Sequence, residues 1–250
     1  MTPTDQPVSP PTPSATLAGK VAIVTGASRG IGRAIAALFA AEDGAVVLAA
    51  RDAERLEENA QVIALDGGRA LAMPVDVADE VSVAALFART AEAFGPVDIL
   101  VNAAGAFARA PIVAMTTATW EAVLNVNLRG TFLCCREAFR VMPPRGGVIV
   151  NFSSLSGVPK VEKFPGNSAY VTSKFGVAGL SEALAVEGKP LNIRVVAVSP
   201  GAVDTEMLRA AAPHLKAGMT PEQMARIVLF LVGPDAAPLH GTNLEIYSNE

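Results

Sequence analysis

The stretch that decides the fold is "VAIVTGASRGIG" (residues 21–32). Its first half is a short, continuous apolar run, which is typical of a strand buried on both faces. Its second half, "TGASRGIG" (25–32), carries Gly26, Gly30 and Gly32. The first glycine permits a tight turn, the second lets backbone approach a pyrophosphate, and the third lets a helix pack against the strand. Because a helix N-terminus would then face the phosphates with free N–H groups, the stretch predicts a dinucleotide site.

On both sides of this stretch, apolar runs alternate with helical patterns. Further strands are predicted at 45–50, 70–77, 97–105, 147–154, 192–201 and 242–248. Helices are predicted at 32–42, 52–66, 79–95, 117–141, 168–187 and 220–233. This alternation predicts an α/β, Rossmann-like doubly wound sheet of about seven mostly parallel strands, with helices on both faces. Ligands of such a sheet bind at the carboxyl ends of the strands.

Composition sets the domain plan. The chain has 250 residues, of which 51% are hydrophobic and only 5% aromatic, which suits close packing of small side chains in one large domain. Residues 1–17, "MTPTDQPVSPPTPSATL", contain five prolines and no core-forming period, so we expect a flexible tail there. The Rossmann-fold domain is expected to cover 18–250.

Charge and reactive side chains exclude several classes of function. The net charge is −4 with no basic block, which disfavours nucleic acid and anionic membranes as partners. No run approaches the ~18 apolar residues of a membrane span, and no secretory signal is recognisable, so a cytoplasmic protein is expected. Cys134 and Cys135 are read as reduced structural thiols. His214 and His240 lack partners for a catalytic triad or a metal site, so no metal is expected.

The end of the second strand bears on the cofactor. An acidic residue there would bind a ribose 2′-hydroxyl, but the strand ends with Ala50 and Arg51. Arg29 in the glycine loop would add a second guanidinium, and two such groups suit a 2′-phosphate. Asp52 is interpreted as a helix cap rather than a ribose ligand, although both arginines could instead be solvated surface residues. NADP(H) is therefore favoured over NAD(H).

"NSAYVTSKF" (167–175) places Tyr170 and Lys174 on one face of a helix. An ammonium nearby would favour phenolate and lower the tyrosine pKa, which would suit proton transfer near neutral pH. The pair alone is common by chance. Ser153 and Ser154 strengthen the case, because they leave the fifth strand just before this helix and could hydrogen-bond a carbonyl.

Taken together, these motifs resemble the short-chain dehydrogenase/reductase family, in its single-domain form of ~250 residues. The resemblance covers Lys20 to Tyr247. Within the family, the chain is most similar in type to 3-oxoacyl-acyl-carrier-protein reductases. It is carried by TGASRGIG, the pair Asp76-Val77, NAAG (102–105), NVNLRGTF (125–132), the Ser154 segment, YVTSK (170–174) and SPGAVDT (199–205).

The resemblance implies roles for four residues. Tyr170 would be the general acid/base, Lys174 would hold the nicotinamide ribose and tune the tyrosine, and Ser154 would orient the substrate oxygen. Asn127, rather than Asn125, would hold a water linked to Lys174. The implied cofactor contacts are Thr25, Gly26, Ser28, Arg29, Gly30, Ile31, Gly32, Arg51, Asp76, Val77, Asn102, Ala103, Gly105, Tyr170, Lys174, Pro200, Gly201, Val203 and Thr205.

The implied activity is hydride transfer between NADP(H) and a small-molecule carbonyl or secondary alcohol, with 3-oxoacyl-carrier-protein reduction as one example. The alternatives are an NAD-dependent alcohol, sugar or steroid dehydrogenase of the same family, and a non-catalytic dinucleotide-sensing protein. A homotetramer or homodimer built through the helices at 117–141 and 168–187 is expected. The segment from Ser154 to Tyr170 is longer than usual for the family and lies where substrate should pass.

Overall fold

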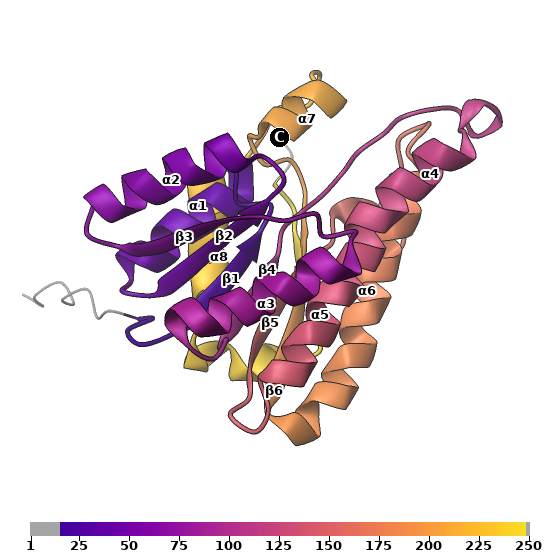
Figure 1. Cartoon of the computed structure of the whole chain (residues 1–250). Coiled ribbons are helices and arrows are strands. Elements are labelled where there is room, and N and C mark those ends of the chain that lie inside the picture. Colours follow the sequence, from indigo (N-terminus) through magenta and orange to yellow (C-terminus); the bar gives the residue numbers. More distant parts are fainter. Residues whose placement is uncertain (1–15, 249–250) are drawn as a thin grey trace, which may run out of the picture.

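The computed structural model describes residues 16–248, which form a sheet covered by helices on both faces (Figure 1). The strand order is β3-β2-β1-β4-β5-β6-β7, and every pair is parallel. The strands are β1 (Val21–Thr25), β2 (Ala45–Ala50), β3 (Arg69–Pro74), β4 (Ile99–Asn102), β5 (Gly147–Phe152), β6 (Ile193–Pro200) and β7 (Asn243–Ile246). The predicted fold class is confirmed, while several predicted strands end two or three residues too late because their last residues turn into the site.

The helices follow the predicted alternation with two differences. They are α1 (Gly30–Ala41), α2 (Ala53–Leu65), α3 (Glu80–Phe94), α4 (Thr117–Leu124), α5 (Gly130–Val141), α6 (Ser168–Gly188), α7 (Glu206–Ala211) and α8 (Pro221–Val232). The predicted helix at 117–141 is interrupted by a π-helical turn, Asn125–Arg129. Helix α7 was not predicted, because six residues are too few to show a clear apolar period.

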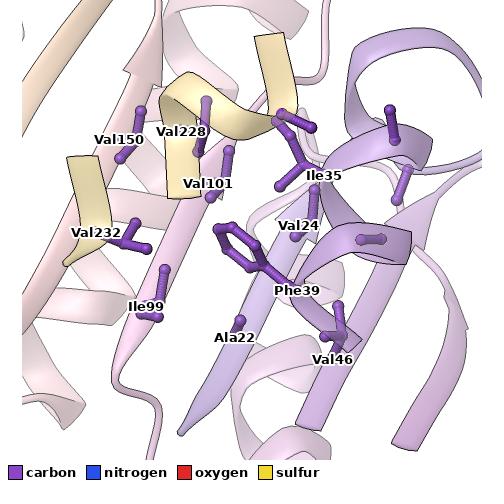
Figure 2. Packing of buried hydrophobic residues seen from close by; sticks show 14 of the residues in the cluster. Ala22, Val24, Ile35, Phe39, Val46, Ile99, Val101, Val150, Val228 and Val232 are labelled. Atoms are coloured by element: carbon purple, nitrogen blue, oxygen red, sulfur yellow. The ribbon is translucent and has the colours of Figure 1, made fainter. Parts of the chain in front are cut away.

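Alternate residues of each strand feed two separate cores. Ala22 and Val24 of β1 pack against α1, α2 and α8, whereas Ile23 faces α3, α5 and α6 on the other side. Figure 2 shows the first of these cores, where Phe39 of α1 is completely buried beside Ile99. The continuous apolar runs of the sequence are thus explained, because both faces of the central strands are covered.

The amino-terminal edge of the described domain includes Leu17, the last residue of the predicted tail. Of the predicted tail at 1–17, residues 1–15 lie outside the described part of the chain. Leu17 is only 3% exposed and packs in the first core, and its N–H donates to the Glu42 carbonyl at 2.9 Å. Leu17 therefore belongs to the folded domain.

A chain of polar side chains crosses the second core. The Asn102 amide donates to Asn151 Oδ1 at 2.8 Å, and the Asn151 amide donates to the Ser181 hydroxyl at 3.0 Å. All three residues are buried, so each satisfies a group that would otherwise lose its hydrogen bond to water. The chain links the ends of β4 and β5 to the middle of α6.

The two cysteines and His240 lie outside the lining of the cavity described below. Cys134 and Cys135 are buried and unpaired, and burial raises the pKa of the Cys135 thiol to about 12. The Nδ1 of His240 accepts a hydrogen bond from the Val195 N–H at 3.2 Å. Within residues 16–248, no helix has both the length and the apolar character needed to cross a bilayer.

Candidate active site

The strand order reverses between β1 and β4, and a cavity of about 740 Å³ opens there at the carboxyl ends of the strands. This is the place where open α/β sheets bind their ligands. The volume lies in the range of small-molecule and cofactor sites. Helix α7 and the segment that follows β4 stand at this edge (Figure 1). One end of the cavity reaches the glycine loop, and the other end is lined by residues around Tyr170.

The glycine loop fits tightly against its surroundings. A Cβ at Gly32 would lie 2.4 Å from the Gly26 carbonyl oxygen, and a Cβ at Gly26 would lie 2.7 Å from the Ala103 oxygen. Gly26 also has a φ of +69°, which disfavours any larger residue. Arg29 precedes α1 without a side-chain cap, so the first N–H groups of α1 remain available to an anion. These features fit the pyrophosphate of a dinucleotide.

A residue that sequence reasoning missed supports the loop from outside. The Asn59 side-chain amide donates to the carbonyls of Ala27 and Ser28, at 3.2 and 3.1 Å. Asn59 lies on α2 one turn beyond Arg55, and Arg55 lies four residues beyond Arg51. This spacing of four residues is the signal that could have identified a helix face directed toward the loop.

The arginines expected to read the cofactor are arranged differently from the prediction. Arg29 Nη1 pairs with Glu206 of α7 at 2.8 Å, and Arg55, which was not predicted, reaches the same carboxylate at 3.4 Å. The hydrogen bond from Arg29 holds the pKa of Glu206 below its usual range. Arg51 is exposed on the cavity wall, and Asp52 caps α2 as predicted, accepting from the Arg55 N–H at 3.2 Å. Glu206 therefore occupies two cations that a phosphate could use.

Most of the predicted cofactor residues meet in the cavity, but two do not line it. Thr25 lies behind the wall, where its hydroxyl accepts from the N–H groups of Ala103 and Ala104, both at 3.1 Å. Asn102 belongs to the buried polar chain. Both residues support the cleft from below. The predicted cofactor residues that line the cavity are Gly26, Ser28, Arg29, Gly30, Ile31, Gly32, Arg51, Asp76, Val77, Ala103, Gly105, Tyr170, Lys174, Pro200, Gly201, Val203 and Thr205.

Tyr170 and Lys174 lie together near the first turn of α6. Lys174 Nζ is 5.6 Å from the centre of the Tyr170 ring and donates to the Phe152 carbonyl at 2.7 Å. Lys174 is 5% exposed, and this burial lowers its pKa to about 8. The Tyr170 pKa differs from the expected direction: burial raises it, and a hydrogen bond with Ser154 lowers it by less. Desolvation therefore outweighs the effect that the sequence suggested for the ammonium.

The two serines after β5 have different partners. The Ser153 hydroxyl is buried and donates to the Lys174 carbonyl at 2.8 Å. The Ser154 hydroxyl faces Tyr170 on the cavity wall and accepts from the Ser156 N–H at 3.1 Å. Both serines line the cavity, but the Ser153 hydroxyl proton is used by the Lys174 carbonyl, so Ser154 is better placed to bond a ligand.

Asn127 is held in the π-helical turn between α4 and α5. Its amide donates to the Ala106 carbonyl at 3.0 Å and to the Ser173 hydroxyl at 2.9 Å, and its Oδ1 accepts from the Ala106 N–H at 2.7 Å. These bonds tie the segment after β4 to α6, next to Lys174. Asn127 is buried and does not line the cavity.

Comparison with known proteins agrees with this geometry. The family model described as short chain dehydrogenase matches residues 20–216. This chain belongs to the short-chain dehydrogenase family.

Similar proteins in the family are named for diverse activities. A cis-4-hydroxycyclohexanecarboxylate dehydrogenase of Sinomonas cyclohexanicum is 38% identical over 92% of this chain and 95% of its own. A 3-oxoacyl-acyl-carrier-protein reductase of Aquifex aeolicus is 35% identical over 92% and 96%. A short chain dehydrogenase from Burkholderia cenocepacia, solved in complex with NADP, is 36% identical with a TM-score of 0.85, covering 92% and 97%. The chain is thus an oxidoreductase of this family.

The half of the cavity beyond Tyr170, called the substrate half below, is formed by the segments that follow β4, β5 and β6. The segment after Ser154 begins with a 3-10 turn, Leu155–Gly157. Lys163 Nζ turns back to donate to the carbonyls of Leu155 and Val158, at 3.1 and 2.6 Å. The residues that line this half are Phe107, Arg109, Ser156, Val161, Glu162, Phe164, Met207, Leu208, Ala211, Ala212 and Leu215.

Proposed function

We propose that this enzyme reduces a carbonyl to a secondary alcohol with NADPH, and catalyses the reverse oxidation with NADP⁺. The observation that carries the proposal is the Tyr170 phenol, which lies beside the buried Lys174 and shares with Ser154 the wall of a cavity that continues to the glycine loop. Tyr170 would be the acid, Ser154 the orienting hydroxyl and Lys174 the cation. A substrate carbonyl bound among them would lie next to the nicotinamide of the cofactor.

The bound cofactor would supply or accept the hydride. The Ser154 hydroxyl would donate a hydrogen bond to the substrate oxygen and so orient the carbonyl. The Tyr170 hydroxyl would donate its proton to that oxygen as negative charge develops there. The raised pKa keeps this phenol protonated at neutral pH, which suits the reduction.

Lys174 would act on both the cofactor and the tyrosine. Its ammonium, buried beside the Tyr170 ring, favours the phenolate that remains after proton transfer. Its free N–H groups would bind the hydroxyls of the nicotinamide ribose. Asn127 would fix the position of Ser173 and the neighbouring Lys174 relative to the segment after β4, because it bonds both Ser173 and Ala106. It would also hold the water that we expect beside Lys174.

The preference for NADP(H) is supported by the cations at the mouth of the cofactor half. Arg29, Arg51 and Arg55 line this mouth, and Asp52, the only acidic residue at the end of β2, is used as a helix cap. We expect Arg51→Asp to shift the ratio of kcat/KM values toward NAD(H) by roughly tenfold or more, because it replaces attraction to the 2′-phosphate by repulsion. Arg226→Asp, an exposed residue on α8, is the matched control; equal ratios in the two variants would contradict the role of Arg51.

The activity is tested by NADPH oxidation against a panel of ketones, oxo acids and a 3-oxoacyl thioester. We expect turnover by the wild type and a fall in kcat of roughly 10²–10⁴-fold in Tyr170→Phe, the range for loss of a general acid. Tyr247→Phe is the control, because that phenol lies on the exposed end of the chain and bonds Glu245. Equal rates in the wild type and Tyr170→Phe contradict the mechanism, and cofactor binding without any turnover favours a sensing protein.

We also propose that the protein forms a homo-oligomer through α5 and α6. Phe132 of α5 and Phe175 of α6 are 43% and 39% exposed, and a second copy would cover them. Light scattering after size exclusion measures the mass. A monomer at micromolar concentration contradicts the proposal, while a dimer or tetramer that Phe175→Glu dissociates supports it.

A further inference from the structure

We propose that Arg109 binds an anionic group of the substrate, so that the carbonyl compounds this enzyme prefers carry a carboxylate or similar oxyanion a few carbons from the reacting carbon. The inference rests on the proposed function, since it assigns a substrate class to the same cavity. It concerns the substrate half, where none of the family motifs lies.

The Arg109 side chain is clamped near its base. Its Nε donates to Asn167 Oδ1 at 3.1 Å, and Asn167 is only 5% exposed. The Ala110 N–H donates to the Gly166 carbonyl at 3.0 Å, and a Cβ at Gly166 would lie 2.9 Å from Arg109 Cγ. The segment after β4 and the segment leading into α6 therefore hold this side chain together.

The outer end of the same side chain is not used by the protein. Within residues 16–248, no ion pair involves Arg109 and no hydrogen bond involves its Nη atoms. The guanidinium carbon lies 5.9 Å from the centre of the Phe107 ring, whose edge-to-face contact with Tyr170 has a centroid distance of 5.2 Å. All three side chains line the cavity, and the Phe107 ring contacts both the guanidinium and the ring of the phenol.

Apart from Arg51 in the cofactor half, the other cations near the cavity have partners. Lys163 donates to two carbonyls, and Arg29 and Arg55 share Glu206. Arg109 is thus the unpaired cation of the substrate half, among the residues that the structure describes. A guanidinium whose two Nη groups are both free suits a carboxylate, which it binds through two parallel charge-assisted hydrogen bonds.

Glu162 lies on the wall of the same half, but within residues 16–248 it forms no ion pair with Arg109. The Glu162 carboxylate would repel an anion. It would therefore disfavour the orientation of the substrate in which the anionic group lies next to Glu162. The opposite charges give the cavity a polarity, and a substrate carboxylate is directed to Arg109 while the carbonyl is left for Tyr170.

The experiment compares each oxo acid with its own methyl ester, which differs in charge but little in shape. Three matched pairs are used: 4-oxocyclohexanecarboxylate, 4-oxopentanoate and 3-oxobutanoate, each with its ester, at pH 7 with NADPH. We expect the acid to have the higher kcat/KM in at least one pair that is turned over. Preference for the ester in every such pair, or turnover of neutral ketones alone, overturns the inference. No turnover of any carbonyl by the wild type refutes the proposed function instead.

Variants then assign the preference to a residue. Arg109→Met should lower the acid-to-ester ratio by roughly tenfold or more, the scale of a lost charge-assisted hydrogen bond, and Arg109→Lys should retain part of it. Glu162→Gln should raise the ratio, and Arg89→Met, an exposed arginine on α3, should leave it unchanged. If Arg109→Met slows acid and ester equally, the residue only positions Phe107 and Tyr170, and the inference is wrong.

Discussion

The two halves of the cavity are built in different ways. The cofactor half is formed by strand ends and backbone, with the Gly32 and Gly26 positions packed so closely that a single methyl group would collide with a carbonyl. The substrate half is formed by long side chains on the segments after β4, β5 and β6, including Phe164, which is 42% exposed. Contact between backbones tolerates no change in size, whereas exposed side chains can be exchanged without disturbing the core. The first half is therefore suited to one ligand, and the second half can diverge.

The largest effect that tests this contrast is expected at the glycine loop. In Gly32→Ala, the new Cβ would force the loop apart, so we expect the Kd of NADPH to rise by roughly tenfold or more and the free energy of unfolding to fall by about 1–3 kcal/mol. Fluorescence titration and denaturant unfolding measure the two quantities. Glu92→Ala on α3 is the control, because that side chain is exposed and away from both the cavity and the helices proposed to pair, and alanine favours a helix. Similar behaviour of both variants would show that the loop is not tightly packed.

A second test concerns Lys174, at the boundary between the halves. Its pKa of about 8 means that the ammonium is present at neutral pH and is lost as pH rises through 8. We expect kcat/KM for reduction to fall by about tenfold per pH unit above that value, while Tyr170, with its raised pKa, still carries its proton. Initial rates between pH 6 and 10 give the profile. Lys174→Arg keeps the charge and should move the decrease in kcat/KM to higher pH. If the decrease stays at the same pH, another group causes it.

A third prediction concerns the substrate half alone. Phe164→Ala should change KM among carbonyl substrates by roughly threefold to tenfold, yet leave the Kd of NADPH and the melting temperature nearly unchanged, because this ring is partly exposed. Phe39→Ala, in the first core, is the contrasting variant and should cost about 3–5 kcal/mol of stability. A large loss of stability in Phe164→Ala would mean that the substrate half is as tightly built as the cofactor half.

The smallest expected effect concerns the carboxylate that joins the halves. Glu206→Gln releases Arg29 and Arg55 for the cofactor phosphates, so we expect the Kd of NADPH to fall by roughly twofold to fivefold, with a larger effect at low salt. Glu92→Gln on α3 serves as the comparison, since its side chain is exposed and distant from the cavity. Weaker binding of NADPH by Glu206→Gln would show that the ion pairs support the loop rather than compete with the ligand.

The sequence predicted the fold, and it named residues of the glycine loop that line one cavity, for a physical reason. Buried parallel strands must be apolar on both faces, and the turn after β1 must contain small residues, so "VAIVTGASRGIG" carries both requirements locally. Lys174 and Tyr170 could be placed together because four residues make about one helical turn.

What the sequence did not predict depends on contacts between distant segments. Glu206 meets Arg29 across 177 residues, and Arg109 meets Asn167 across 58, so neither pair has a local signature. The direction of the Tyr170 pKa shift was also missed, because burial of the phenol is a property of the assembled cavity and not of the Tyr-x-x-x-Lys spacing.

The buried chain Asn102–Asn151–Ser181 has a consequence for how this sequence can change over time. Replacing any one member by an apolar residue removes a buried hydrogen bond of its neighbour, which the weaker contacts of Cys135 Sγ with Asn102 and Asn151 replace only in part. Replacing two neighbours together removes donor and acceptor at once. The three positions should therefore covary among descendants of this sequence, with a single change tolerated less well than a paired one.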